Sequence, residues 1–420
     1  MNLTLKGLFW KSSETFIFRL IGILSNYIYF YLISIKLGPE EIGVFAFYQA
    51  LLLFSSIFPQ FGLSTSIIKF ISNNHFDKKN VILKSLLTMT FLSLLTIVII
   101  YFFGDLMFFK KDNFSFSMLV VFSLFPFTIL NVIPEVFRSL GKMRLFILYK
   151  YTLVPIFGLI IIVLSNFSIS PIKSYIFGIY LVFLILIFHS YKDFFSFNEK
   201  TNNKDFSIKY LIKVSFPMLL SGSGLIFMSW IDSFMLGIVG SSFSDVGIYN
   251  ICVKIASSTS IILFSINGII APKIAELYNS KKIMELSSII SNSTKLIFMF
   301  TLPILIILIL FSKKILNFFG PEFQIGFIAL IILCIGQLVN AACGSVGYIM
   351  QLTGNEKVFK NIILTCLFIN IILNIYLIPI YGMNGAAFSS SICLVFWNIF
   401  SMFYIKSKLS LNTYFKFKWK

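Results

Sequence analysis

The sequence predicts an all-α protein that crosses a membrane many times, and three observations support this prediction. Of its 420 residues, 58% are hydrophobic and only 12% are charged, with a mean hydropathy of +0.93. Apolar runs of about 18 to 25 residues, long enough for a helix to cross a bilayer, recur from end to end. These runs lack the alternating polarity of membrane barrel strands. The solvent of this chain is therefore lipid.

Each apolar run is expected to form one transmembrane helix, giving twelve helices in all. Prolines within or near the ends of these runs are expected to kink the helices, because lipid requires every backbone group to be satisfied internally. The first run contains Arg19 and is not followed by a small-residue cleavage site, so we expect it to be retained. The expected spans are residues 12–36, 41–70, 84–104, 114–139, 145–166, 171–191, 210–239, 246–270, 288–311, 322–350, 358–380 and 383–405.

The positive charges predict the orientation of these spans. If the first residue is cytoplasmic, most of the 34 Lys and Arg residues fall on the cytoplasmic side, because short basic loops resist translocation. Both termini are then cytoplasmic. The net charge of +18 is thus a topological signal and no sign of nucleic-acid binding, although the basic loops are expected to contact anionic lipids. The basic residues expected on the outer side are Lys36, Lys110, Lys111, Lys173, Lys313 and Lys314.

The chain also shows an internal repeat. The segment EEIGVF at 40–45 aligns with SDVGIY at 244–249, and SLGKMRLF at 139–146 aligns with LTGNEKVF at 352–359, with Gly141 over Gly354 and Phe146 over Phe359. We therefore expect an N-terminal six-helix lobe (1–191), a polar cytoplasmic linker (192–209) and a C-terminal six-helix lobe (210–420). An even number of helices per repeat relates the lobes by a pseudo-twofold axis along the membrane normal, with a cleft between them.

Polar stripes at helical spacing follow one face of several spans. A charge at the bilayer centre costs between about 3 and over 10 kcal/mol, so Arg19 and Lys254 should face water or protein. The neutral stripe in span 322–350 is equally explained by close helix packing. The stripes are Ser12, Thr15, Arg19, Gly22 and Asn26; Gly247, Asn250, Lys254, Ser257, Ser258, Ile261 and Ser265; and Gly336, Asn340, Cys343, Gly344, Gly347 and Gln351.

One acid, Asp232, lies within the uncharged run GLIFMSWIDSFMLGIVG. At 1.5 Å per residue, Asp232 lies about 10 Å below the outer surface of the membrane. Lys254, on the next antiparallel helix, lies about 12 Å below the same surface. One hypothesis is an Asp232–Lys254 ion pair that joins the two helices. Another is that the pair opens when an anionic substrate or a proton arrives. Glu135 and Arg138, one turn apart, are expected to form a local pair.

Catalytic motifs are missing from the sequence. It has two histidines and none of the HExxH, GxSxG or P-loop patterns, so we predict a protein that is not an enzyme and uses no cofactor or metal. The five cysteines all fall within predicted spans and are expected to pack as small apolar groups. A membrane glycan polymerase or ligase is an alternative, but it would need a large outer loop, and every outer loop here is short.

Several segments, taken together, resemble a known family. They are residues 37–70, WIDSFMLG (230–237), VGIYNICVKIA (246–256), APKIAELY (271–278), FFGPEF (318–323), QLTGNEKVF (351–359) and NIYLIPIYGMNGAAFSS (374–390). In order along nearly the whole chain, they resemble the polysaccharide-transport branch of the MOP exporter superfamily, the Wzx-type O-antigen and capsule flippases. In such relatives Asp-Arg often occurs where this chain has Asp232-Ser233.

The resemblance implies a two-lobed, MATE-like fold and alternating access. It implies transport of oligosaccharide repeat units on undecaprenyl diphosphate, from the cytoplasmic to the periplasmic leaflet of the bacterial inner membrane, for surface polysaccharide such as lipopolysaccharide O-antigen or capsule. A monomer that works with a glycan polymerase and a chain-length regulator is expected. The alternative within the superfamily is a multidrug or cation exporter, which would need acids facing its cavity.

The flippase reading assigns roles to the polar stripes. The cationic side chains of Arg19 and Lys254 are expected to bind the diphosphate. Asp232 is expected to pair with Lys254 and to release it when the substrate or a proton arrives. Amide side chains are expected to donate hydrogen bonds to sugar hydroxyls. The predicted cavity residues are Arg19, Lys254, Asp232, Asn26, Asn250, Asn340 and Gln351.

Overall fold

The computed structural model describes residues 5–72, 77–107, 114–195, 206–240 and 242–414, and every regular element in these ranges is helical. The elements are α1 (Leu5–Gln60), α2 (Leu63–Ser72), α3 (Lys78–Met107), α4 (Phe114–Phe122), α5 (Leu124–Ser139), α6 (Met143–Ile147), the π-helix η2 (Leu148–Thr152), α7 (Leu153–Leu164), α8 (Pro171–Phe195), α9 (Ile208–Val239), α10 (Phe243–Ser258), α11 (Ser260–Asn279), α12 (Ile283–Leu310), α13 (Ser312–Asn317), the 3-10 helix η3 (Pro321–Gly326), α14 (Phe327–Cys343), α15 (Val346–Leu352), α16 (Glu356–Tyr381) and α17 (Met383–Leu409). The predicted all-α class is confirmed.

The first two predicted spans are joined end to end in α1. Gly38, with φ of 81° and ψ of −176°, interrupts the helical backbone, and Pro39 then begins the second segment. Proline suits this position because the first turn of a helix leaves its N–H groups unpaired in any case. The apolar part of α1, Ile17–Gln60, is 44 residues long. At 1.5 Å per residue, its two helices, which meet at the kink at Gly38, contain enough residues for two crossings of a hydrocarbon layer.

The number of membrane spans can be compared with the prediction of twelve. Among the described residues, nine helices are long and apolar enough to cross a bilayer, or ten if the bent pair α10–α11 forms one span. That pair turns by 41° between Ser258 and Ser260. The apolar stretch Ile226–Val239 forms the C-terminal part of α9. The count of twelve stays a prediction.

The chain divides into two compact units. Unit 1 comprises Met1–Leu37 and Tyr48–Ile226, and unit 2 comprises Gly38–Phe47 and Phe227–Lys420. This division falls within α9 and assigns a short piece of α1 to unit 2, whereas the predicted linker was 192–209. Residues 196–205 of that linker lie outside the described part of the chain. The predicted lobe boundaries therefore remain a prediction.

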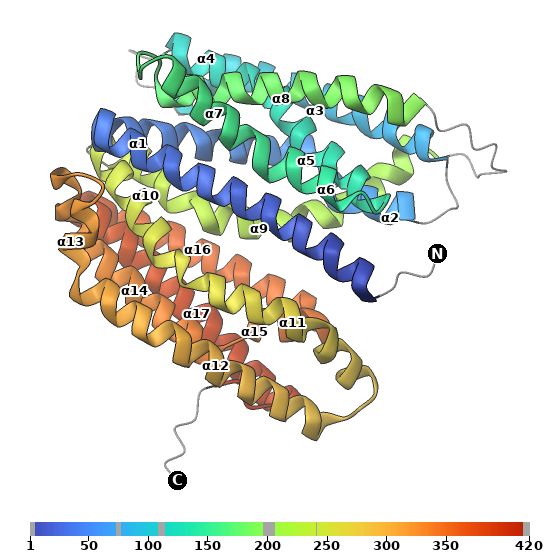
Figure 1. Ribbon diagram of the computed structural model, residues 1–420, viewed down its shortest axis with the longest axis vertical. Helices are drawn as coiled ribbons and strands as arrows, with labels where there is room; N and C mark the ends of the chain where they lie inside the picture. Colours follow the sequence, from blue (N-terminus) through green and yellow to red (C-terminus); the bar gives the residue numbers. More distant parts are fainter. Residues whose placement is uncertain (1–4, 73–76, 108–113, 196–205, 241, 415–420) are drawn as a thin grey trace. The chain divides into compact units, whose positions relative to one another are not determined.

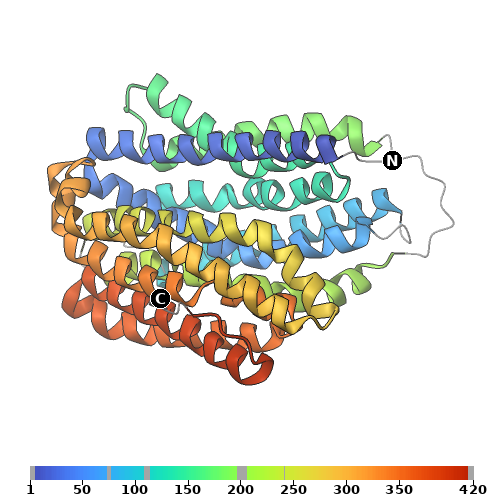
Figure 2. The same cartoon turned by 60° about the horizontal axis from the view of Figure 1, so that its bottom comes forward.

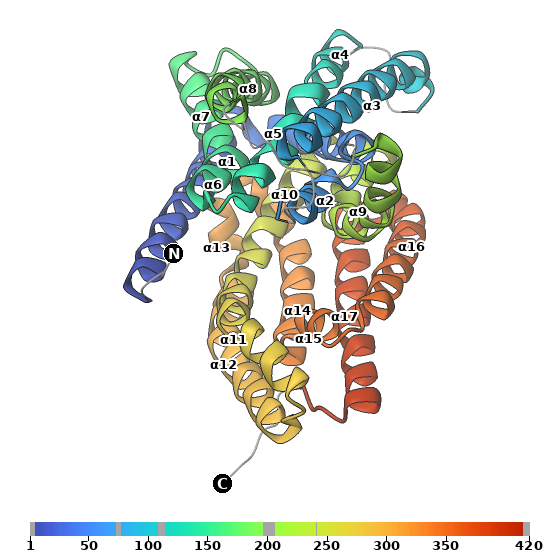
Figure 3. The same ribbon diagram turned by 90° about the vertical axis from the view of Figure 1, so that its right-hand side faces the viewer.

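In unit 1, helices pack in pairs. Buried hydroxyl groups form hydrogen bonds between the helices of several of these pairs. Helices α7 and α8 lie along each other, and α5 packs against α2, α3 and α8 (Figures 1 and 3). The hydroxyl of Tyr29 on α1 donates to the carbonyl oxygen of Pro171 at 2.5 Å and lies 2.8 Å from Ser174 Oγ. These bonds fix α1 against the start of α8. Such polar links stabilise helix pairs in lipid, where apolar burial alone gives no preference for protein over solvent.

Unit 2 has its core around α14, α16 and α17. Helices α16 and α17 run side by side (Figure 2), and α14 packs along α17. Gly336 of α14 allows this approach, because a Cβ there would lie 3.1 Å from Ser391 Oγ. An apolar cluster that includes Ile290, Val346 and Ile363 joins α12, α15 and α16.

The predicted repeat is visible within unit 2 as a reciprocal contact between two glycines. A Cβ on Gly43 would lie 1.7 Å from the carbonyl oxygen of Phe243, and a Cβ on Gly247 would lie 1.9 Å from that of Pro39. Gly43 aligns with Gly247 in the repeat, and Pro39 aligns with Phe243. Gly43 thus contacts Phe243, and its equivalent Gly247 contacts Pro39, the equivalent of Phe243. A local twofold axis produces this kind of reciprocal contact. Glycine is required at both positions because any side chain would collide with the facing backbone.

Candidate functional site

A cavity of about 380 Å³ lies within unit 1. Its walls come from α1, α5, η2, α7 and α8, and they combine cationic, amide and tyrosine side chains with a few apolar ones. The lining residues are Arg19, Gly22, Ile23, Asn26, Tyr27, Phe127, Leu130, Asn131, Tyr149, Lys150, Tyr151, Val154, Pro155 and Tyr175.

The first polar stripe of the sequence forms one wall of this cavity. Arg19, Gly22 and Asn26 all line it, as expected from their helical spacing. Arg19 is exposed, and its Cζ lies 5.4 Å from the centroid of the Tyr151 ring. Gly22 brings α1 onto η2 backbone to backbone, since a Cβ there would lie 2.5 Å from the Tyr151 carbonyl oxygen. The side chains of Ser12 and Thr15 are outside the described part of the chain.

The opposite wall is built on the π-helical turn η2. The sequential residues Tyr149, Lys150 and Tyr151 all reach the cavity from this turn. A π-turn is wider than an α-turn and is found frequently at functional sites. The Oγ1 of Thr152 donates to the carbonyl oxygen of Phe18 at 3.0 Å and to that of Ile147 at 3.2 Å, which holds η2 against α1. This wide turn brings Lys150 into the cavity.

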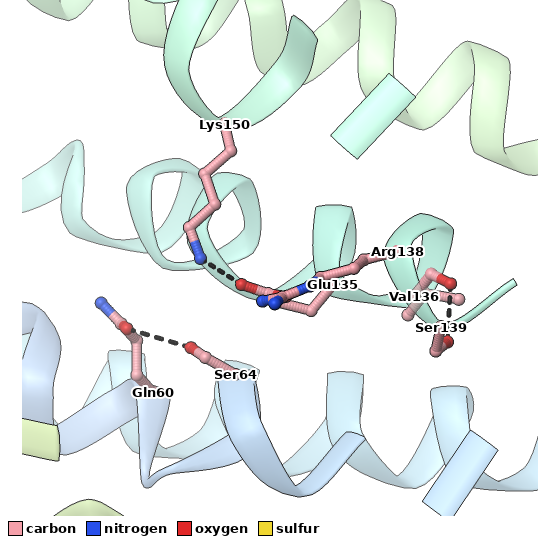
Figure 4. A network of polar contacts seen from close by, with 7 residues as sticks. All are labelled: Gln60, Ser64, Glu135, Val136, Arg138, Ser139 and Lys150. Atoms are coloured by element: carbon pink, nitrogen blue, oxygen red, sulfur yellow. Dashed lines mark hydrogen bonds and ion pairs between the residues drawn. The ribbon is translucent and has the colours of Figure 1, made fainter. Parts of the chain in front are cut away.

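Lys150 forms an ion pair with the buried acid Glu135 (Figure 4). The Glu135 side chain is 5% exposed, and its Oε2 also lies 3.4 Å from Arg138 Nη1. The predicted Glu135–Arg138 pair is therefore confirmed, and Lys150 is an additional partner. This contact could not be predicted from the sequence, because Lys150 lies 15 residues after Glu135 and reaches it from the π-helical turn. A buried carboxylate needs such a partner, because an unpaired charge in a low-dielectric interior is strongly unfavourable.

The cavity presents positive charge and hydrogen-bonding groups together. Among the described residues that line it, none is acidic, and both charged ones are cations. Tyr149, whose hydroxyl lies 2.7 Å from His189 Nδ1, adds an oriented aromatic ring. Guanidinium and ammonium groups bind phosphate oxygens, while amides and hydroxyls bind neutral polar groups. The cavity can thus accept an anion that carries hydroxyl groups.

Asp232 forms a separate polar cluster within unit 2. Its Oδ1 accepts hydrogen bonds from the amides of Asn370 at 3.0 Å and Asn374 at 2.7 Å, and its Oδ2 accepts one from the hydroxyl of Ser390. The hydroxyl of Tyr249 lies 3.1 Å from Ser390 Oγ. Neutral donors on α16 and α17 therefore surround the carboxylate.

The hypothesis that Asp232 pairs with Lys254 is wrong. Within the described part of the chain, Asp232 forms no ion pair with Lys254 and is satisfied by amide and hydroxyl donors instead. Amide and hydroxyl donors of this kind satisfy the oxygens of a buried carboxyl group without a cation. Asn370 and Asn374 are the residues that sequence reasoning missed. Their spacing of one helical turn in an otherwise apolar span was the available signal.

The comparisons with known proteins agree with this architecture. The sequence model of the family described as Polysaccharide biosynthesis protein matches residues 5–278, and that of the family described as MatE matches residues 217–376. The chain belongs to the polysaccharide biosynthesis protein family. The resemblance to the polysaccharide-transport branch of the MOP superfamily is thereby confirmed.

Two proteins of Haloferax volcanii are similar in sequence to this chain. The probable low-salt glycan biosynthesis flippase Agl15 is 22% identical over 405 residues, which cover 96% of this chain and 84% of the relative. The probable flippase AglR is 24% identical over 177 residues, which cover 41% of this chain and 37% of the relative. The longer match extends along almost the entire chain.

Solved structures show the same fold. An inward-facing MATE family multidrug transporter of the MOP superfamily has a TM-score of 0.69 at 15% identity, covering 93% of this chain and 94% of that one. The lipid II flippase MurJ in an inward closed conformation has a TM-score of 0.69 at 17% identity, covering 94% and 87%. This polysaccharide biosynthesis protein is therefore a multi-pass membrane protein with a MOP-type fold.

The other predicted site residues of this family member lie in unit 2, and most make contacts within the protein. Asn250 donates to Ser233 Oγ at 3.1 Å, and Gln351 donates to the Gly347 carbonyl oxygen at 3.2 Å. The amide nitrogen of Asn340 donates to Gln337 Oε1 at 3.1 Å. Lys254 is half-buried on α10. Of the seven predicted residues, Arg19 and Asn26 line the unit 1 cavity together.

The cysteines are free thiols that lie in the helical core. Cys252, Cys334, Cys343, Cys366 and Cys393 are buried free thiols. Among the residues that the structure describes, no group of three His, Cys, Asp or Glu side chains could hold a metal ion. The thiols pack in the helical core, where cysteine behaves as a small apolar group.

Proposed function

We propose that this protein is a flippase that moves a lipid-linked oligosaccharide across the membrane by alternating access. The family match and the flippase relatives support this proposal. The substrate is an oligosaccharide repeat unit on undecaprenyl diphosphate, transferred from the cytoplasmic to the periplasmic leaflet of the bacterial inner membrane. The product supplies surface polysaccharide synthesis, together with a glycan polymerase and a chain-length regulator.

The observation that carries the proposal is the composition of the unit 1 cavity. Arg19 and Lys150 provide two cations, and Asn26 and Asn131 provide amides in the same space. Rings of Tyr27 and Tyr149 add surfaces on which sugar rings can stack. A diphosphate joined to hydroxylated sugars needs this combination of positive charge, hydrogen-bonding groups and aromatic surface.

The mechanism follows from the energetics of the head group. A diphosphate with several sugars cannot cross hydrocarbon alone, because its charges and its hydroxyls would both lose their hydration. In our proposal Arg19 binds the diphosphate and Asn26 and Asn131 hydrogen-bond the sugars, while the polyprenyl tail stays in lipid. Glu135 holds Lys150 in position and limits the positive charge when no substrate is bound.

Unit 2 contributes a third cation in this proposal. Lys254 on α10 binds the diphosphate at a later stage of transport, and Asp232 stabilises unit 2 through its hydrogen bonds. Replacing Lys254 with alanine is expected to abolish surface polysaccharide in cells that depend on this protein, while the protein still accumulates in the membrane. Normal surface polysaccharide would remove Lys254 from the transport site.

A cation or multidrug exporter is the second candidate, favoured by the MatE match and by the MATE structures. Such a transporter would attract its substrate with acids. Neither cation in the unit 1 cavity suits that role, and Glu135 is already paired with Lys150. This charge arrangement favours the anionic substrate.

Purified protein in liposomes distinguishes the two candidates. The flippase predicts translocation of a fluorescent undecaprenyl-diphosphate oligosaccharide and none of a cationic dye such as rhodamine 6G. Dye transport without glycolipid transport would overturn the proposal in favour of the exporter.

A further inference from the structure

Glu135 has a cation beside each of its carboxylate oxygens, and the two cations differ in their surroundings. Its Oε1 forms the ion pair with Lys150, which lines the unit 1 cavity. Its Oε2 lies 3.4 Å from Nη1 of Arg138, whose side chain is 48% exposed and is not part of the cavity wall. Helix α5 provides Glu135 and Arg138, and the π-turn η2 provides Lys150. The carboxylate therefore joins a cation of the cavity to a cation outside it (Figure 4).

Lys150 and Arg19 lie beside the same aromatic ring. The Nζ of Lys150 is 5.9 Å from the centroid of the Tyr151 ring, and the Cζ of Arg19 is 5.4 Å from it. The Lys150 ammonium is also 5.5 Å from the centroid of the Phe146 ring. Cations at such distances are attracted to the faces of aromatic rings. The two rings can therefore hold the Lys150 ammonium near Arg19 when it is not bound to Glu135.

The pairing with Glu135 determines how much positive charge the empty cavity offers. Lys150 is neutralised by this pair, whereas no acidic residue is present among the described residues that line the cavity with Arg19. A lipid monophosphate that carries a sugar has one negative charge, which Arg19 alone balances. A lipid diphosphate that carries a sugar has two negative charges. Within this cavity, the second phosphate is balanced when Lys150 leaves Glu135.

The second contact of Glu135 makes this exchange possible. A buried charge that loses its only partner is strongly destabilised. Glu135, which is 5% exposed, keeps the contact with Arg138 when Lys150 turns to the substrate. Phosphate oxygens accept charge-assisted hydrogen bonds from an ammonium group, as carboxylate oxygens do. The Glu135 carboxylate and a substrate phosphate are therefore competitors for the same ammonium group.

We propose that Glu135 is an internal competitor of the substrate, and that the exchange at Lys150 makes the cavity select lipid diphosphates over lipid monophosphates. This inference rests on the proposed transport of a lipid-linked oligosaccharide. In the empty cavity Glu135 occupies Lys150. When the substrate binds, Arg19 binds one phosphate, the second phosphate displaces Glu135 from Lys150, and Arg138 keeps Glu135. A singly charged lipid binds Arg19 and leaves the pair between Lys150 and Glu135 closed.

The test compares two lipids that carry the same sugar, one on undecaprenyl monophosphate and one on undecaprenyl diphosphate. Their dissociation constants are measured by native mass spectrometry with the full-length protein in phosphatidylcholine nanodiscs, which contain no anionic lipid. The wild type should bind the diphosphate at least about tenfold more tightly, as expected from one additional charge-assisted hydrogen bond. The monophosphate reports binding that does not involve Lys150.

Two substitutions should change diphosphate binding in opposite directions. Glu135→Gln removes the competitor and should tighten diphosphate binding at least about threefold, in the range of couplings within one ion-pair network. Arg138→Gln leaves Glu135 with Lys150 alone, which strengthens that pair and should weaken diphosphate binding by a similar factor. Monophosphate binding should not change in either variant. If the pair only stabilised the fold, both lipids would be affected alike.

Each substitution has a matched control. Glu285→Gln neutralises the acid of the exposed Lys282–Glu285 pair, in which Lys282 Nζ lies 3.3 Å from Glu285 Oε1 in unit 2. Arg144→Gln removes the same charge as Arg138→Gln from an exposed residue that does not line the cavity. Both controls should bind the two lipids as the wild type does.

If Glu135→Gln does not fold, the double variant Glu135→Gln/Lys150→Gln removes both charges together and should bind the diphosphate no more tightly than the monophosphate. Equal binding of the two lipids by the wild type would overturn the inference and leave the proposed function standing. Weaker diphosphate binding in Glu135→Gln, or a diphosphate preference retained in the double variant, would do the same. Binding of neither lipid by the wild type would overturn the proposed function, and the inference with it.

Discussion

Arg19 of unit 1 and Asp232 of unit 2 are both charged side chains in apolar helices, but their surroundings differ. Arg19 is exposed in a cavity and lies against one tyrosine ring. Asp232 is 4% exposed and accepts hydrogen bonds from three neutral side chains. A charged group that binds a ligand needs hydrogen-bonding positions that the ligand can reach. A charged group that stabilises the fold has these positions filled by neighbouring side chains. The two sites are thus suited to different roles, and this contrast can be tested.

The largest effect is expected on stability, at Asp232. Asp232→Ala removes an acceptor shared by the amides of Asn370 and Asn374 and the hydroxyl of Ser390, and each buried donor left unsatisfied costs about 1 to 3 kcal/mol. We expect the free energy of unfolding to fall by about 3 kcal/mol or more, measured by denaturation in mixed micelles. Asp232→Asn, which keeps one acceptor oxygen, should lose less. Equal stability of Asp232→Ala and the wild type would show that the cluster is not structural.

The next effect is expected on transport, at Arg19. Arg19→Ala removes charge-assisted hydrogen bonds to the substrate worth about 1.5 to 3 kcal/mol, which corresponds to a loss of roughly 10- to 150-fold in glycolipid transport. The unfolding midpoint should not change, because the side chain is exposed. Arg144→Ala is the matched control, since Arg144 is exposed, does not line the cavity and lies over the ring of Phe18. Equal losses in both variants would contradict a specific role of Arg19.

The smallest effect is expected for the coupling between Glu135 and Lys150, which combines features of both regions. Each single substitution, Glu135→Gln or Lys150→Met, should destabilise the protein, and the double variant should lose less than the two losses added together. We expect a coupling energy of about 1 to 2 kcal/mol in a double-mutant cycle of unfolding free energies. Additive losses would show that the pair is not coupled and that Glu135 depends on Arg138 alone.

Sequence reasoning found what local pattern encodes and missed what depends on distant segments. The stripe that contains Arg19, Gly22 and Asn26 could be predicted because helical spacing alone places its members on one face. The partners of Asp232 could not be predicted, since Asn370 is 138 residues away and Ser390 is 158 residues away along the chain. Lys150 was missed for a third reason. Its place in the cavity depends on a π-turn, which has no reliable sequence signal.

By itself, the sequence determined the lipid-solvated helical class, the family and the paired glycines of the repeat. Hydrophobic length and helical periodicity are properties of neighbouring residues, so they can be read without a fold. The tertiary structure alone decided that Asp232 is satisfied by amide and hydroxyl donors of α16 and α17, and that Glu135 pairs with Lys150. The partners of a buried polar group are selected by which helices pack together, and that packing is a property of the whole chain.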